Sequence, residues 1–250
     1  MREKIERQFG VARSLAIYYA PGRIRRLCRF YESLLSPGDL CFDIGAHVGN
    51  RTVAWLRLGA RVIAVEPQAH LLDWLRRLHG RSPALTTVRA AVGSVPGTAT
   101  LRHDPRNPTV STLSEEWIKA VRRDPSFGGV RWRTAERVAV TTLDALIAEY
   151  GRPVLCKIDV EGYEAEALRG LSQPLPIVSF EYIPAAMNVA HACLDQLTSL
   201  GAYHYNWFEG ESHRWVSRRW LTSGEMATQL DQLAAGRASG DIFGRLASVA

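Results

Sequence analysis

Cysteine and metal-binding patterns are scarce in this sequence. Its 250 residues contain four cysteines, Cys28, Cys41, Cys156 and Cys193, and no two of them have CxxC spacing. This excludes a disulfide framework and predicts reduced thiols, as in a cytoplasmic protein. No histidine pairs with a cysteine or with another histidine at metal-ligand spacing, so no structural zinc site is predicted.

Long apolar runs are also absent. The run from Leu15 to Ala20 is short, and Arg23, Arg25 and Arg26 follow it closely. We interpret it as part of an amphipathic helix and predict no export signal. No run approaches the roughly 20 apolar residues that a membrane helix requires, so we predict no membrane span.

Lysine is rare, because Lys4, Lys119 and Lys157 are the only lysines among 31 basic residues. The net charge of +6 therefore comes mostly from arginine, which favours planar contacts to carboxylates or phosphates. The arginines are dispersed, without a dense basic stripe interleaved with aromatic residues. We expect no nucleic-acid partner. A homo-oligomer is compatible with the sequence.

Apolar runs alternate with helical patterns along most of the chain, which predicts an α/β protein with a parallel sheet covered on both faces. The expected strands are 40–44, 61–65, 87–92, 154–158, 177–180, 203–208 and 241–246, with a short return strand at 98–102 and an extended segment at 138–141. Residues 1–36 are expected to form an N-terminal helical cap, and residues 37–250 the main domain. Residues 103–137, which we call the insertion, are polar and rich in proline and glycine, with one expected helix at about 114–122.

Four expected strands end in acidic residues, Asp43, Glu66, Asp159 and Glu181. Parallel sheets bind their ligands at the carboxyl ends of the strands. We therefore expect all four carboxylates to line one crevice.

The first of these strand ends opens the turn Asp43–Asn50, which should lead from a strand into a helix and so suits a nucleotide-like ligand. Glu66 lies 21 residues after Gly45, where an acid can accept both ribose hydroxyls of NAD or of S-adenosylmethionine. An NAD site favours a further glycine at the position of Asn50. Asp43 would repel a pyrophosphate and suits the cationic groups of S-adenosylmethionine.

A second block, Lys157–Glu164, places Asp159 and Glu161 around one apolar residue at a strand end. If the chain stays extended, the two carboxylates point to the same side. The pair could hold the ligand's amino group, act as general base or bind a divalent metal through oxygen. A structural role at the start of a helix is the remaining alternative. Our prediction is a site without a metal.

These blocks, with three shorter ones, resemble the FkbM family of S-adenosylmethionine-dependent methyltransferases over about residues 34–181. The residues that carry the resemblance are Phe42–Asn50, Val65–Pro67, Thr142–Asp144, Lys157–Glu166 and Phe180–Glu181. The resemblance implies a class I methyltransferase (Rossmann-like) fold with a mostly parallel seven-stranded sheet and helices on both faces. It also implies methyl transfer to oxygen, typically to a hydroxyl of a sugar, glycan or polyketide-type product.

The resemblance assigns the turn to the methionine end of the cofactor, Glu66 to the ribose, and Asp159 and Glu161 to the region of the methyl group. The predicted cofactor-binding residues are Asp43, Gly45, Ala46, His47, Gly49, Asn50, Glu66, Pro67 and Asp159. Asp159 is the first candidate for the general base, followed by Glu161, His47 and Glu181.

The acceptor, a small molecule or glycan with a free hydroxyl, is expected between the N-terminal helices and the insertion. The candidate acceptor residues are Arg106–Thr112, Trp117, Trp132, Tyr18, Tyr19, Arg23 and Arg26. Among them, Trp117 and Trp132 could form a platform that stacks on a sugar face. An RNA or other nucleic-acid methyltransferase is disfavoured, because no strand end carries an Asn/Asp-Pro-Pro-aromatic block. An NAD-dependent oxidoreductase is disfavoured by the turn, and a non-catalytic binding module by the intact set of site residues.

Overall fold

A seven-stranded sheet forms the centre of the computed structural model, which describes residues 2–247, with side chains from residue 5 onward. The outermost residues of the expected division into 1–36 and 37–250, namely 1 and 248–250, lie outside the described residues. The strands of this sheet are β1 (Leu40–Ile44), β2 (Arg61–Val65), β3 (Leu85–Val88), β8 (Leu155–Ile158), β9 (Ile177–Tyr182), β10 (Tyr203–Glu209) and β11 (Gly240–Leu246).

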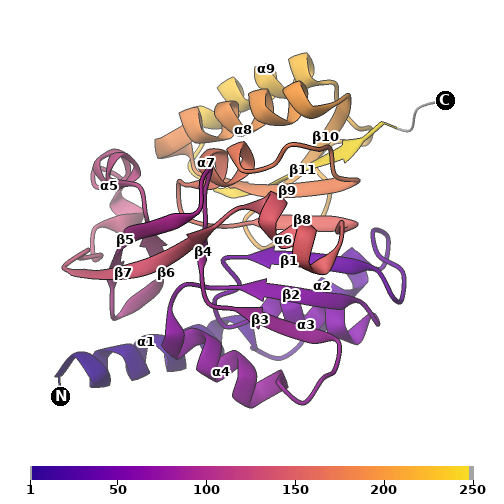
Figure 1. Ribbon diagram of the computed structural model, residues 1–250. Helices are drawn as coiled ribbons and strands as arrows, with labels where there is room; N and C mark the ends of the chain where they lie inside the picture. Colours follow the sequence, from indigo (N-terminus) through magenta and orange to yellow (C-terminus); the bar gives the residue numbers. More distant parts are fainter. Residues whose placement is uncertain (1, 248–250) are drawn as a thin grey trace.

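Their order in the sheet is β10-β11-β9-β8-β1-β2-β3 (Figure 1). The strands from β9 to β3 pair in parallel, and β11 runs antiparallel to both of its neighbours. This confirms the predicted mostly parallel seven-stranded sheet. The central strands are mostly apolar because helices bury both of their faces.

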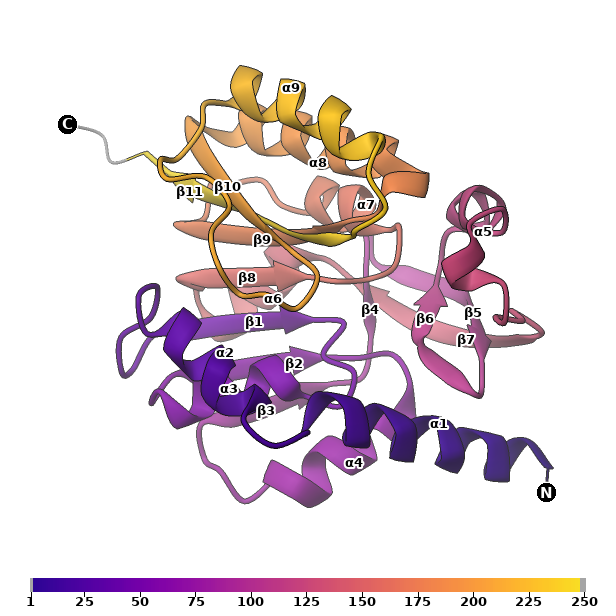
Figure 2. The same cartoon turned by 180° about the vertical axis from the view of Figure 1, so that it is seen from behind.

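Helices cover the two faces of the sheet, with α3 and α6 on opposite sides (Figures 1 and 2). On one face, α2 (Arg23–Tyr31) and α3 (Asn50–Arg57) pack on alternate residues of the strands, including Cys41, Leu155, Ile177 and Phe243. The other face carries α6 (Leu143–Tyr150), α7 (Glu164–Arg169), α8 (Met187–Leu200) and α9 (Ser223–Ala234). The helix α4 (Ala69–His79) packs through Leu72 and Leu75 against Ala46 and Ala64.

The pairing of strands places several polar residues on the face that α2 and α3 cover. Asp43 pairs with Lys157, Lys157 pairs with Ser179, and one alternate position further along Glu181 pairs with Asp241. Side chains alternate between the two faces along each strand, and residues that are paired across neighbouring strands point to the same face of the sheet. The apolar face therefore becomes polar at the carboxyl ends of the strands.

A second, four-stranded sheet is present, which the sequence did not predict as a separate sheet. It contains β4 (Ala91–Val92), β5 (Gly97–Asp104), β6 (Asn107–Thr112) and β7 (Thr134–Thr141), in the order β4-β7-β5-β6, and we call it the small sheet. The expected strand 87–92 is thus wrong as a single element, because β3 and β4 belong to different sheets. Both views show the small sheet beyond the ends of β1 and β8 toward which their arrows point (Figures 1 and 2).

The insertion is consequently more regular than expected. Its helix α5 (Glu115–Val121) begins after Ser114, whose side chain accepts a hydrogen bond from the backbone N–H of Trp117. One turn of 3-10 helix, Pro125–Phe127, follows, and a second such turn, Pro184–Ala186, precedes α8. Strands β6 and β7 supply the rest of the ordered structure in this segment.

The N-terminal segment contacts both sheets. The helix α1 (Arg2–Tyr18) packs through Val11 against Val48 and Leu71, while Gly10 lies so close to the backbone of Pro105 that no side chain would fit. In contrast, α2 buries its apolar face in the same core as α3. Among the described residues, no helix combines the length and apolar character needed to cross a membrane.

Candidate active site

A cavity of ≈ 270 Å³ lies at the carboxyl ends of the parallel strands. All four strand-end acids, Asp43, Glu66, Asp159 and Glu181, line it. Residues from α1, from the small sheet and from the loop after β10 complete its wall. The sequence therefore located this crevice correctly, since the carboxyl ends of parallel strands meet at one edge of a sheet.

The first turn passes directly against the turn after β8. Gly45 has φ of 80°, and a side chain there would reach the carbonyl oxygen of Asp159, at 1.9 Å from its Cβ. Only glycine allows this approach. Gly49, also predicted to bind the cofactor, is not part of the cavity lining. It precedes α3 with φ of 79° and leaves room for the side chain of Leu75.

Asp43 is buried and joins this turn to α3. Its Oδ2 accepts hydrogen bonds from the backbone N–H of Thr52 at 3.0 Å and from the Thr52 hydroxyl at 2.5 Å. Burial raises the pKa of Asp43, against the lowering effect of the Thr52 bond. Asp43 thus fixes the first turn of the helix and also lines the cavity.

Glu66 is the most extensively hydrogen-bonded of the four acids. Its Oε2 accepts from the backbone N–H of His47 at 3.0 Å, and its Oε1 accepts from the backbone N–H of Gln68 at 2.9 Å. The Gln68 side chain also donates to Glu66 and to the carbonyl of Pro108 in the small sheet. Burial raises the pKa of Glu66 to about 7, against the effect of these bonds. Sequence reasoning missed Gln68, which lines the cavity.

His47 forms part of the cavity wall in a left-handed conformation, with φ of 50°. Its ring meets the ring of Tyr18 edge to face, with centroids 5.6 Å apart. Burial lowers the pKa of His47 to about 4, so the imidazole is neutral at pH 7. Such a group is a weak proton acceptor, which argues against His47 as the general base.

Three acids of the cavity lining lie close together. One carboxylate oxygen from each of Asp159, Glu161 and Glu181 lies within 4.8 Å of the others. The expected extended chain is wrong here: Glu161 has φ of 55°, and this left-handed turn brings it beside Asp159. Burial and the neighbouring Asp159 raise the pKa of both Glu161 and Glu181 well above the ordinary range.

A buried network of charges lies behind these acids, and most of it escaped the sequence reasoning. Lys157 Nζ donates to Asp159 Oδ2 at 2.7 Å and lies 3.5 Å from Asp241 Oδ1. Arg51, on α3, donates to Asp241 Oδ2 at 3.3 Å and to both carboxylate oxygens of Glu211. Lys157 lay inside a recognised block, whereas no local pattern connects Arg51, Glu211 and Asp241.

Three carboxylates at this spacing could hold a divalent cation. The Lys157 ammonium, however, already bonds to Asp159 and would repel a second positive charge at the same carboxylate. The site without a metal stays our prediction.

The cavity lining also includes Tyr18, Thr109, Ser111 and Tyr163. Trp117 and Trp132 do not form the sugar platform that the sequence suggested. They pack edge to face on each other, with centroids 5.9 Å apart, Trp117 is buried, and Trp132 Nε1 donates to the carbonyl of Val110. Aromatic residues in this polar segment instead build its own small core.

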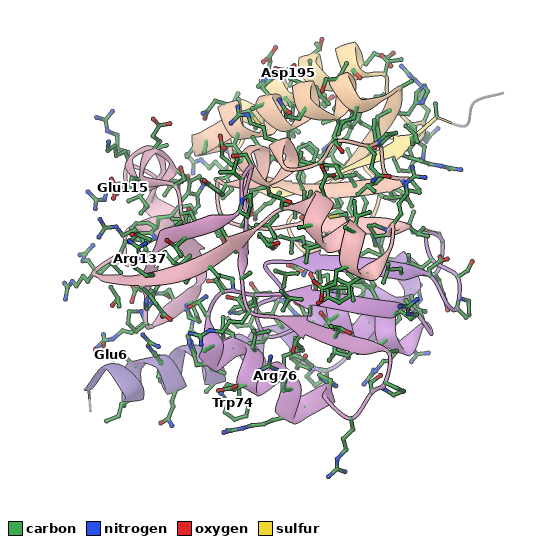
Figure 3. The ribbon with its side chains drawn as sticks, in the orientation of Figure 1. Glu6, Trp74, Arg76, Glu115, Arg137 and Asp195 are labelled. Atoms are coloured by element: carbon green, nitrogen blue, oxygen red, sulfur yellow. The ribbon has the colours of Figure 1, made fainter. Side chains whose placement is uncertain are left out.

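Of the N-terminal candidates, only Tyr18 reaches the main cavity. The Tyr19 hydroxyl donates to the carbonyl of Val48, and Arg23 and Arg26 line a smaller neighbouring pocket. On the outer surface, exposed side chains of both signs project from separate elements, for example Arg76, Glu115, Arg137 and Asp195 (Figure 3).

Comparison with known proteins finds methyltransferases. A family model described as the methyltransferase FkbM domain matches residues 43–203. Methyltransferase sdnD of Sordaria araneosa is 31% identical over an alignment of 194 residues. The match covers 62% of this chain and 73% of that protein.

The solved structure of a TehB-like SAM-dependent methyltransferase from Corynebacterium glutamicum has a similar fold. It gives a TM-score of 0.50 at 13% identity and covers 94% of each chain. At this identity the likeness shows the fold alone, which is the class I fold expected from the sequence.

Proposed function

Because the chain belongs to the FkbM methyltransferase family and is an S-adenosylmethionine-dependent methyltransferase, we propose that it methylates a hydroxyl of an uncharged small molecule or glycan. The observation that carries this proposal is the single cavity that joins Glu66 to the acids Asp159, Glu161 and Glu181. One end has the chemistry for a ribose, and the other has proton acceptors for a hydroxyl.

Three acids of the cavity lining, Asp43, Glu66 and Asp159, fit the cofactor. Glu66 presents a buried carboxylate that can accept two ribose hydroxyls. Asp43 and Asp159 supply negative charge suited to the ammonium and sulfonium groups, and the same charge opposes the pyrophosphate of a dinucleotide. When bound, S-adenosylmethionine supplies an electrophilic methyl group.

Glu161 is better suited than Asp159 to accept the proton of the acceptor hydroxyl. The Lys157 ammonium already bonds to Asp159, which leaves Asp159 as an anchor for positive charge. Within residues 5–247, neither the Glu161 nor the Glu181 side chain has a hydrogen-bond or ion-pair partner, and because their pKa values are raised, each of them in its ionised form is a stronger base than an ordinary carboxylate.

The proton should leave while the new bond forms, because an aliphatic hydroxyl has a very high pKa. We propose that it passes from the hydroxyl oxygen to a carboxylate oxygen of Glu161, with Glu181 as the neighbouring acceptor. Orientation of the hydroxyl in the cavity can supply much of the rate.

The charges of the cavity favour an acceptor without phosphate or carboxylate near its reacting hydroxyl. The described lining has two cationic side chains, Arg51 and Lys157, and both are already paired with acids. A buried anion brought next to Glu161 and Glu181 would lack a partner and be repelled. The same argument disfavours a nucleic-acid substrate at this site.

The direct test is isothermal titration of the protein with S-adenosylhomocysteine and, separately, with NADH. We expect saturable binding of S-adenosylhomocysteine and none of NADH at matched concentrations. Transfer of label from radioactive S-adenosylmethionine should then be measured to neutral polyols, to nucleotide sugars and to RNA. Binding of NADH, or label found only in RNA or in anionic acceptors, would contradict the proposal.

A further inference from the structure

The turn between β8 and α7 carries Glu161 in an uncommon conformation. Glu161 and Gly162 are both left-handed, with φ of 55° and 85°. Glycine adopts this region freely, whereas for a residue with a side chain it costs on the order of 1–2 kcal/mol. Contacts around the turn must therefore hold Glu161 in place.

Glu164 supplies the first of these contacts. Its Oε1 accepts hydrogen bonds from the backbone N–H of Val160 at 2.9 Å and of Gly162 at 3.2 Å, the two residues on either side of Glu161. Bonds from N–H groups to a carboxylate are stronger than those between neutral groups. Glu164 is only 2% exposed, so little water competes for this oxygen.

Close contacts at two glycines, Gly162 and Gly45, also hold the turn in place. A side chain at Gly162 would meet the Trp117 ring, with Cδ1 at 2.1 Å from its Cβ. At the start of the turn, the Asp159 carbonyl lies against Gly45. Trp117 belongs to the insertion and Gly45 to the first turn, so Glu164 closes a clamp to which three separate segments contribute.

We propose that Glu164 is a positioning residue that holds the turn Asp159–Gly162 so that the Glu161 carboxylate reaches the reaction end of the cavity. This inference rests on the proposed function insofar as Glu161 acts on the acceptor. The clamp itself is a property of the protein without ligand.

Burial raises the pKa of Glu164 itself to about 7, and once Glu164 is ionised its charge has a second effect on Glu161. Together with burial and Asp159, it raises the pKa of Glu161. Two substitutions separate the effects. Glu164→Gln keeps a carbonyl oxygen for the two N–H groups and removes the charge, whereas Glu164→Ala removes both. Glu166→Ala, on the same helix, is the matched control because its partners are Ser94 and Arg169.

The test uses protein labelled with carbon-13 at the glutamate carboxyl groups, titrated by NMR without ligand. The Glu161 signal is assigned by its loss in Glu161→Gln. In Glu164→Gln the Glu161 pKa should fall while thermal stability stays near wild type, and Glu166→Ala should titrate as wild type. In Glu164→Ala, methyl transfer should fall by about tenfold or more while the affinity for S-adenosylhomocysteine stays within about threefold, since about 1.4 kcal/mol lost only at the reacting group is tenfold in rate.

Loss of the charge alone should move the Glu161 pKa equally in Glu164→Gln and Glu164→Ala, whereas loss of the two N–H bonds should move it further in Glu164→Ala, because the Glu161 carboxyl group then leaves its buried position. Equal Glu161 pKa values in the two folded variants would overturn the proposal. If Glu164→Ala does not fold, Glu164→Asp decides, because it keeps the charge but is too short to reach both N–H groups: an unchanged Glu161 pKa in folded Glu164→Asp would overturn the proposal. Failure of wild-type protein to bind S-adenosylhomocysteine would instead overturn the proposed function and leave the titration result standing.

Discussion

Glu66 connects cofactor recognition to pH at the scale of one residue. Burial raises its pKa to about 7 in the folded protein, above the ordinary value of about 4.3 for an unfolded chain. Its contribution to stability is therefore full below the unfolded value and is lost as pH rises through about 7. The ionised form, by contrast, is the one that can accept two ribose hydroxyls. Folding and cofactor binding thus favour opposite protonation states of this carboxyl.

We therefore predict that wild-type affinity for S-adenosylhomocysteine increases as pH rises from 6 to 8. Glu66→Gln should weaken binding about 10- to 100-fold, as expected for the loss of one or two bonds to a charged group, and should flatten this pH dependence. Isothermal titration at several pH values measures both effects. Asp73→Asn, at an exposed position of α4, should behave as wild type. A pH slope that survives in Glu66→Gln would assign the dependence to another group.

At the scale of elements, the contact between α5 and the turn after β8 depends on Gly162. Gly162→Ala should cost about 1 kcal/mol for its positive φ and a further 1–3 kcal/mol for the overlap with Trp117. Gly22→Ala is the matched control, since Gly22 has φ of 82° and no atom within 4 Å of the added carbon. Urea unfolding should show the larger loss for Gly162→Ala. Equal losses would mean that the Trp117 contact adjusts without cost.

Local sequence patterns predicted the elements whose ends are marked by residues next to them in the sequence. β1 and β2 match the expected ranges 40–44 and 61–65, because their apolar runs end at glycine or charged residues. Parts of β5 and β7 were expected as extended segments, but their pairing as a separate sheet was missed, since these strands expose alternate polar residues and β5 pairs with β7 across the whole insertion. Pairing over such a distance leaves no local signature.

The candidate site likewise contains residues that the sequence pattern predicted and residues that it did not. The strand-end acids could be found because the topology of a parallel sheet brings strand ends together. The position of Glu161 depends on a left-handed turn, and that of Trp117 on a separate aromatic core, so the extended chain and the sugar platform were both wrong. Asp241 enters the site through β11, whose place between β9 and β10 cannot be inferred from spacing along the chain.

At the scale of the whole molecule, one buried network joins the first helix after the cofactor turn to the last strand. Arg51 and Asp241 are 190 residues apart in sequence, and both are more than nine-tenths buried. Against the effect of burial, the charges of Lys157 and Arg51 lower the pKa of Asp241. Asp241 is therefore held as an anion between two cations, which links α3, β8 and β11.

Arg51→Ala should leave Asp241 and Glu211 without one of their cations, at a cost of about 3–5 kcal/mol in the free energy of unfolding. Arg57→Ala, at an exposed position of the same helix, should change it by less than about 0.5 kcal/mol. Urea unfolding of both variants at pH 7 measures the difference. Arg51 lies next to Asn50 in the cavity wall, so Arg51→Ala should also weaken binding of S-adenosylhomocysteine, measured under conditions where the variant is folded. Removing one partner from a buried ion pair leaves an uncompensated charge, which destabilises the fold. If Arg51→Ala were nevertheless as stable as Arg57→Ala, the link between α3 and β11 would depend on apolar packing and not on the ion pairs.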